Sequence, residues 1–94
     1  MERTPIKRSN GEKAMKRLET KLEDQIVLKG DGTFVSSHEC YGKLAEEMEE
    51  LREASCCSWG AWIKSEEIRE LLLNIAVLAV FGVACLEQKE MELH

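Results

Sequence analysis

The feature that most constrains the fold is a long apolar run in the last third of the sequence. From Leu71 to Leu86 the only strongly polar side chain is the amide of Asn74. A membrane span needs about 20 apolar residues, so this shorter and interrupted run favours a buried helix and argues against a membrane partner. A helix that is apolar on every side must be covered on every side.

The composition favours helices as the elements that cover it. Of the 18 acidic residues 16 are Glu, which is a good helix former, and only two are Asp. The 94 residues suffice for one small domain, 1–94, whose own core is marginal. We therefore expect an all-α fold: a small antiparallel helical bundle with about three helices per chain, completed by oligomerisation into a homodimer or homotetramer.

Three segments have helical periodicity. In the first, Ser9 and Glu12 have the spacing of a capping box, which leaves residues 1–9 as a flexible lead. In the second, Ser36 and Glu39 repeat that spacing, and the helix runs to about residue 54. The third begins at the predicted N-cap Ser65 and extends to about residue 90. Apolar stripes mark the first two helices: Met15, Leu18, Leu22 and Ile26, then Tyr41, Leu44, Met48 and Leu51.

Charge and cysteine content restrict the function classes. The net charge of −5 opposes nucleic-acid binding, which requires an accessible basic face. The sequence starts without the apolar core of a secretory signal, so we expect a cytoplasmic protein. Its four cysteines are then expected to be reduced thiols.

Carboxylates recur in one pattern on two predicted helices. Glu46, Glu47 and Glu50 form a Glu-Glu-x-x-Glu cluster, and residues 66, 67 and 70 repeat it. Glu67, Glu70 and Asn74 project from one side of their helix, which continues into the apolar run at Val77 and Phe81. Carboxylates beside an apolar pocket need a cation, and paired carboxylates on antiparallel helices suit Mg²⁺. The alternative is a set of solvated helix faces, with Asn74 fixing the register of the bundle.

These motifs resemble those of the MazG-like, all-alpha nucleoside triphosphate pyrophosphohydrolases. That family carries Glu-Glu-x-x-Glu, a spacer, and then Glu-x-x-Asp. The similarity covers roughly residues 34–88 and identifies 34–90 as a MazG-like helical core. It implies hydrolysis of a nucleoside triphosphate to the monophosphate and pyrophosphate, with Mg²⁺, or alternatively Mn²⁺, as cofactor. By the motif, the metal ligands are Glu47, Glu50, Glu67 and Glu70.

The resemblance also assigns further roles. Glu46 supports the ligands and takes a proton from the attacking water. Glu70 departs from the family pattern, which usually has Asp there. An alignment shifted by one turn places Asn74 at that position and Leu71 where a ligand Glu belongs, which describes a degenerate member. We name Asn74, Trp59 and Lys64 as substrate-binding candidates; the Trp59 loop alternatively anchors on the core.

Two rivals come from other classes. The first is a non-catalytic helical oligomer with a structural or regulatory role, in which the Glu pairs are solvated. The second is a membrane-associated helix protein, built on the apolar run. Stabilisation by a divalent metal distinguishes the enzyme from the non-catalytic oligomer. Solubility of the full chain without detergent excludes the membrane-associated protein.

Overall fold

The computed structural model describes residues 2–28, 32–56 and 61–88, and for residue 28 and residues 61–64 it describes the backbone alone. Helices make up 84% of the described residues, and there is no strand among them. The elements are α1 (Arg8–Glu23), the π-helical turn η1 (Asp24–Leu28), α2 (Ser37–Cys56) and α3 (Ala61–Glu87). The all-α prediction is confirmed.

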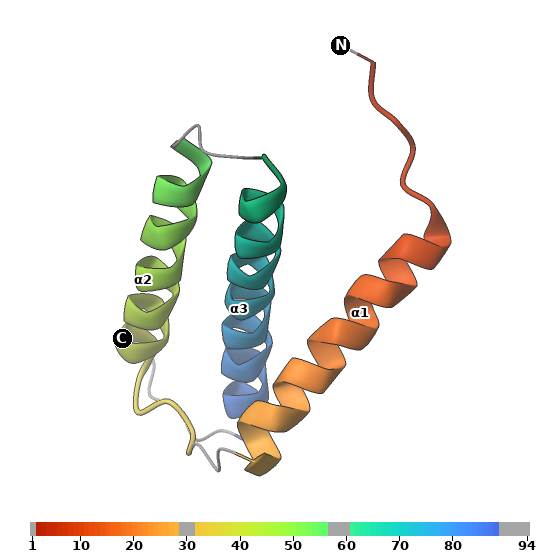
Figure 1. Cartoon of the computed structure of the whole chain (residues 1–94). Coiled ribbons are helices and arrows are strands. Elements are labelled where there is room, and N and C mark those ends of the chain that lie inside the picture. The colour runs from red at the N-terminus through yellow and green to blue at the C-terminus, as the bar shows by residue number, and fades with distance from the viewer. Residues whose placement is uncertain (1, 29–31, 57–60, 89–94) are drawn as a thin grey trace.

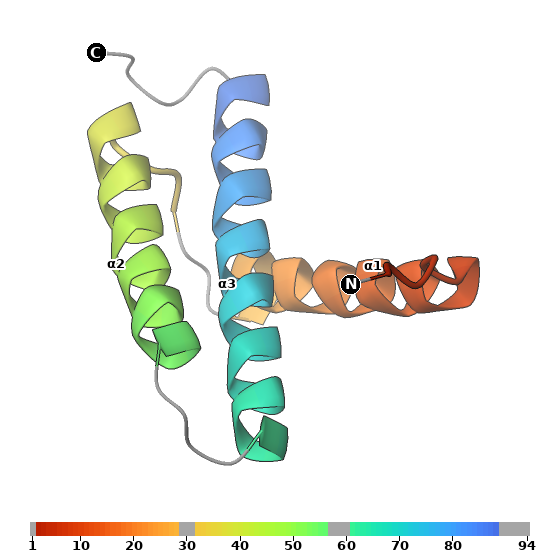
Figure 2. The ribbon, with the colours of Figure 1, turned by 90° about the horizontal axis from the view of Figure 1, so that it is seen from above.

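The helices form a hairpin with an arm. α2 and α3 lie side by side and antiparallel, and α1 leaves the hairpin at a wide angle, with its C-terminal end beside α3 (Figures 1 and 2). α3 is packed against both other helices. The longest and most apolar helix therefore occupies the centre of the chain.

Of the three predicted helix starts, one is confirmed. At α2, the Ser36 hydroxyl accepts the Glu39 N–H at 3.3 Å, and the Glu39 carboxylate accepts the Val35 N–H at 3.1 Å. At α1, Lys7 is the N-cap residue and makes no side-chain cap, so the Ser9 box is wrong, and residues 8 and 9 are helical rather than part of a lead. α3 already begins at Ala61, so Ser65 lies inside the helix.

The core joins the connector before α2 to the C-terminal half of α3. The rings of Phe34 and Phe81 meet edge to face, with centroids 5.2 Å apart, and the Phe34 N–H donates to the Cys85 sulfur at 3.4 Å. Leu22 and Cys40 pack against this cluster. Apolar burial thus fixes the hairpin and touches α1 only near its C-terminal end.

Gly82 lets α2 and α3 approach closely at this core. A Cβ atom built on Gly82 would lie 2.9 Å from the sulfur of Cys40, closer than such atoms pack in proteins. The glycine, which is unfavourable inside a helix, is therefore explained by the contact between the two helices.

The apolar stripe predicted for α2 is only partly correct. Leu44 and Leu51 are half-buried, but Tyr41 and Met48 are 72% and 52% exposed. Apart from Ala45, the positions of α2 that are not exposed are instead spaced at alternate intervals of three and four residues: Ser37, Cys40, Leu44, Glu47, Leu51 and Ala54. A carboxylate, Glu47, thus occupies the middle of the face that packs on α3.

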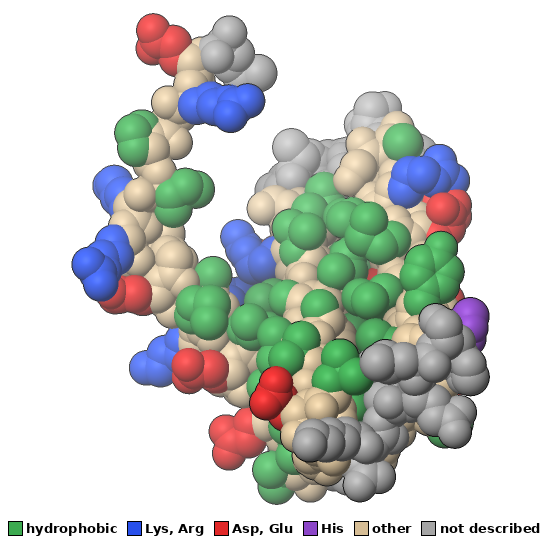
Figure 3. All heavy atoms as spheres, turned by 180° about the vertical axis from the view of Figure 1, so that it is seen from behind, with side chains coloured by type: hydrophobic (Ala, Val, Ile, Leu, Met, Phe, Trp, Pro, Cys, Tyr) green, Lys and Arg blue, Asp and Glu red, His purple; other side chains and the backbone are tan. Residues whose placement is uncertain are grey.

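One side of α3 remains exposed in the part of the chain that the structure describes. Leu72, Val80, Val83 and Leu86 are between 37% and 56% exposed. Viewed from behind, apolar side chains gather over α3 (Figure 3). Ser65–Glu87 is the one described segment long and apolar enough to cross a membrane, a property that core helices of soluble proteins share. Two helices do not cover α3, as expected.

Candidate functional site at the α2–α3 seam

The candidate site is a polar network inside the α2–α3 seam, with Asn74 at its centre. Asn74 follows Leu71 and precedes Val77 on the inner side of α3, and both of these neighbours are buried. Its amide nitrogen donates to Glu47 Oε2 of α2 across a long hydrogen bond of 3.5 Å. One predicted metal ligand and one predicted substrate-binding residue are therefore neighbours.

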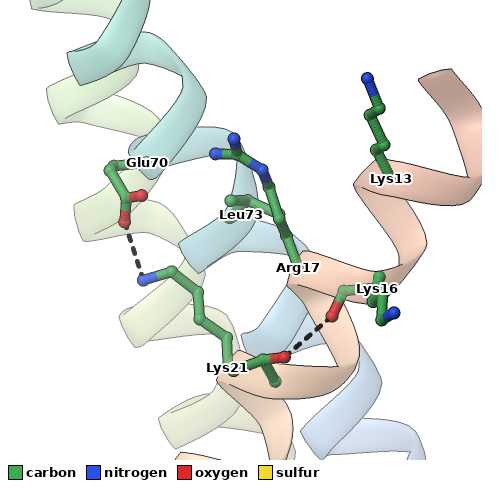
Figure 4. A pocket seen from close by; sticks show the side chains of 7 residues that line it. Lys13, Lys16, Arg17, Lys21, Glu70 and Leu73 are labelled. Atoms are coloured by element: carbon green, nitrogen blue, oxygen red, sulfur yellow. Dashed lines mark hydrogen bonds and ion pairs between the residues drawn. The ribbon is translucent and has the colours of Figure 1, made fainter.

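Lys21 of α1 joins this network from the other side. Its ammonium group donates to the side-chain oxygen Oδ1 of Asn74 at 2.8 Å. It also lies 3.0 Å from Glu70 Oε2 (Figure 4). The Lys21 side chain is 32% exposed and that of Glu70 is 54% exposed. Asn74 thus accepts from a cation and donates to a carboxylate, so its amide orientation follows from its two partners.

The network brings together two of the four predicted metal ligands. Glu47 is half-buried, and Glu70 is tied to it through Lys21 and Asn74. Glu50 and Glu67 are exposed, as is the predicted proton acceptor Glu46. Glu67 and Glu70 were expected beside an apolar pocket; both are exposed, and Glu70 lines an opening between α1 and α3.

Neighbouring Glu residues are engaged in local pairs on the helix surfaces. Glu49 accepts three bonds from the Arg52 guanidinium, the shortest at 2.5 Å, and this hydrogen bonding together with the Arg52 charge lowers the pKa of the Glu49 carboxyl. Glu66 forms an ion pair with Arg69 three residues later. Exposed pairs of this kind contribute little to stability.

The arrangement of the carboxylates bears on the predicted magnesium site. Within residues 2–28, 32–56 and 61–88, no three His, Cys, Asp or Glu side chains converge closely enough to hold a metal ion. The cation that Glu70 contacts in this arrangement is the Lys21 ammonium. The side chains as they lie do not fit a four-carboxylate metal cage, and the magnesium assignment stays a prediction.

Two substrate-binding predictions fall outside the described side chains. Trp59 lies in the segment 57–60, and Lys64 belongs to the first residues of α3, for which the structure describes only the backbone. Asn74 is the one candidate of the three that can be placed.

Lys21 is the functional residue that the sequence analysis missed. It lies three residues after Leu18 and one before Leu22, so it sits beside the apolar stripe of its helix. That position was visible in the sequence. Its partners were not, because they depend on where α1 crosses α3.

A cavity of about 270 Å³ opens beside this network and is lined by Lys21, Glu47, Asn74 and, from η1, Asp24. It combines carboxylates, an amide and one ammonium group, with Val77 and Leu78 as an apolar floor. Such a mixture of convergent polar groups on an apolar base is typical of a small-molecule site.

Comparison with known proteins gives no relative. No protein-family model, no curated protein and no solved structure matches this chain.

Proposed function

We propose that the chain is a Mg²⁺-dependent nucleoside triphosphate pyrophosphohydrolase, which converts a nucleoside triphosphate and water to the monophosphate and pyrophosphate. The observation that carries the proposal is the half-buried Glu47, which accepts a bond from Asn74 at the α2–α3 seam. A carboxylate in the middle of a helix–helix seam weakens packing, so its position favours a chemical role. The repeated Glu-Glu-x-x-Glu motif and its family resemblance supply the reaction class.

The proposal assigns roles to the residues of the chain. Glu47, Glu50, Glu67 and Glu70 would be the oxygen ligands after a rearrangement of their side chains, and Asn74 would hold Glu47 in orientation through its amide. A bound Mg²⁺ would supply neutralisation of phosphate charge and a water of lowered pKa. Glu46, exposed beside Glu47, would take the proton of the attacking water while the bond between the α- and β-phosphates breaks and pyrophosphate leaves.

Lys21 is the residue whose present position opposes the metal. Its ammonium group pairs with the Glu70 carboxylate and donates a hydrogen bond to the side-chain oxygen of Asn74. For Glu70 to act as a ligand, Lys21 has to leave it. Metal binding in this proposal therefore includes a movement of the Lys21 side chain or of the α1 arm.

The direct test is pyrophosphate release from a panel of ribo- and deoxyribonucleoside triphosphates with Mg²⁺. We expect Glu47→Gln and Glu70→Gln each to lower kcat/KM by about 100-fold. Glu49→Gln is the matched control, because Glu49 pairs with Arg52 outside the network, and it should keep full activity. Absence of pyrophosphate release with every nucleotide, from folded protein, rejects the proposal.

A non-catalytic helical oligomer is the second candidate, and the uncovered side of α3 favours it. Leu72, Ala76, Ala79, Val83 and Leu86 recur at alternate intervals of four and three residues, the spacing of a coiled-coil seam. All of them except the half-buried Ala76 are exposed. The proposal is that a second copy covers this face, in a cytoplasmic homodimer or homotetramer that has no membrane partner.

The mass of the chain in solution tests this second candidate. A dimer or tetramer by light scattering is expected for the wild type, and Val83→Glu should shift it toward the monomer. Tyr41→Glu is the control, because Tyr41 is an exposed apolar residue of α2 and not of α3. An oligomer that releases no pyrophosphate supports the non-catalytic structural role. A wild-type monomer, or a chain that dissolves only in detergent, contradicts that role.

A further inference from the structure

A second opening lies between α1 and α3, next to the polar network. It has a volume of about 490 Å³ and is lined on α1 by Lys13, Lys16, Arg17 and Lys21, and on α3 by Glu70 and Leu73. We call it the cationic cleft. The side chains of Arg17 and Lys21 extend toward α3, whereas those of Lys13 and Lys16 do not extend toward it (Figure 4).

Three cations of the cleft share one face of α1, because Lys13, Arg17 and Lys21 follow one another at intervals of four residues. Lys16 lies at the edge of that face. Two successive pairs, Lys13 with Arg17 and Arg17 with Lys21, are like charges four residues apart, which weakens an isolated helix. In a chain of net charge −5, this concentration of cations is not a consequence of composition.

Most of this positive charge is not balanced inside the protein. Lys21 is paired with Glu70. Among the described residues, Lys13, Lys16 and Arg17 form no ion pair. The cleft therefore carries three cations without a counterion and has room for a ligand of small-molecule size.

We propose that the cationic cleft binds the polyphosphate chain of a small anion, such as a di- or triphosphate. The guanidinium of Arg17 offers two parallel donors to a phosphate, and the lysine ammonium groups act as mobile point charges around it. The choice of a triphosphate rests on the proposed function, but binding in the cleft requires neither Mg²⁺ nor turnover.

The extent of the charge favours a short anion over a nucleic acid. Residues 13 to 21 span about 12 Å along the helix. Glu12, Glu19 and Glu23, which are exposed on the same helix, interrupt or border the cations. A long polyanion that continued past the cleft would meet these carboxylates, whereas a triphosphate would end before them.

Lys21 connects the cleft with the seam network. It lines the cationic cleft and also the smaller cavity that contains Glu47 and Asn74. A phosphate chain in the cleft would compete with Glu70 for the Lys21 ammonium group. The anion would thus lie directly beside the carboxylates named in the proposed function.

Calorimetric titration of the full chain with sodium tripolyphosphate in the presence of EDTA tests the inference. We expect saturable binding, weakened at least about tenfold in Lys13→Gln/Arg17→Gln, and weaker in high salt. Lys43→Gln, which removes one exposed cation from α2 outside the cleft, should bind as the wild type does. Circular dichroism verifies that the variants, all at exposed positions, remain folded.

Three results would overturn the inference. The first is no binding of tripolyphosphate by the folded wild type. The second is equal weakening by the cleft variant and by Lys43→Gln, which indicates a general charge effect. The third is tighter binding of a single-stranded oligonucleotide. Tripolyphosphate binding without pyrophosphate release from any nucleotide rejects only the proposed function. Pyrophosphate release without tripolyphosphate binding rejects only the cationic cleft as a binding site.

Discussion

The two contacts of α3 differ in kind. Its contact with α2 and with the connector before α2 contains the buried pair Phe34 and Phe81, together with Gly82 at a point of close approach to Cys40. Its contact with α1 contains no fully buried residue of that helix, and it depends on Leu22 and on the polar bonds of Lys21. Apolar burial contributes far more stability than partly exposed ion pairs. The α2–α3 hairpin is therefore the stable part, and α1 is the part that opens first.

This difference in stability bears on the proposed function, because the hairpin and α1 contribute side chains of opposite charge to the site. The carboxylates of the proposed site belong to the hairpin, and the cations that face them belong to the arm. Displacement of α1 would take Lys21 away from Glu70 and Asn74. The region that is easiest to open is thus the one that controls which cation the carboxylates contact.

The largest effect is expected from the core of the hairpin. Phe81→Ala removes one ring of the edge-to-face pair and leaves a cavity, which should lower the free energy of unfolding by about 3–5 kcal/mol. Urea unfolding measures the loss. Tyr41→Ala, at an aromatic residue that is 72% exposed, is the control and should cost much less. Similar losses in the two variants would mean that the hairpin core is placed elsewhere.

The close approach at Gly82 is the next point to test. A methyl group there would meet the Cys40 sulfur at 2.9 Å, so Gly82→Ala should lower the free energy of unfolding by about 1–3 kcal/mol. Cys40→Ala in the same chain removes the sulfur and should restore part of the loss. Because Ala is the better helix former, a Gly82→Ala variant that is more stable than wild type would contradict this packing.

A smaller effect is expected at the α1 contact. Lys21→Met removes the bonds to Glu70 and Asn74 but keeps an unbranched side chain, and we expect a loss of about 1 kcal/mol. Hydrogen exchange should accelerate in α1 and stay unchanged in α3. Lys16→Met, which removes an exposed cation without a described ion pair, is the control. Equal acceleration along all three helices would show that α1 is not a separate unit.

The smallest effect concerns pH and the Cys40 thiol. Burial, and second the nearby Cys85, raise the pKa of Cys40 above its ordinary value. Because the folded state then holds this proton more tightly than the unfolded state does, stability is unaffected below about pH 8.5 and declines as the pH rises further toward the folded pKa. Unfolding at several pH values measures the decline, which Cys40→Ala should reduce. An identical decline in that variant would contradict the assignment.

Local signals in the sequence predicted part of this structure. The abundance of Glu and the helical periodicities predicted the three helices, and the Ser36 box predicted the start of α2, because capping depends on adjacent residues alone. The apolar run was also expected to exceed what two helices can cover, and four apolar residues of α3 are exposed in the described structure: Leu72, Val80, Val83 and Leu86. Oligomerisation and metal binding remain predictions.

The sequence predicted the candidate site less well. Glu47 and Asn74 were both named, but the apolar stripe predicted for α2 included Tyr41 and Met48, which are exposed. A hydrophobic pattern cannot identify a seam that contains a carboxylate. A hydrophobic pattern also does not identify Lys21, because the partners of Lys21 depend on where α1 crosses α3. Long-range partners, rather than helix formation, were the part that local rules could not predict.

We propose, as the central claim, that Glu47, Asn74 and Glu70 belong to one metal-responsive site across two helices. Nuclear magnetic resonance of the labelled full chain during titration with Mn²⁺, a paramagnetic oxygen-seeking ion, tests it most directly. We expect selective broadening of the Asn74 side-chain amide and of backbone resonances near Glu47 and Glu70, and its loss in Glu47→Gln. Broadening that is absent, or that is unchanged in Glu47→Gln and centred on Glu49 and Glu53, would contradict the claim.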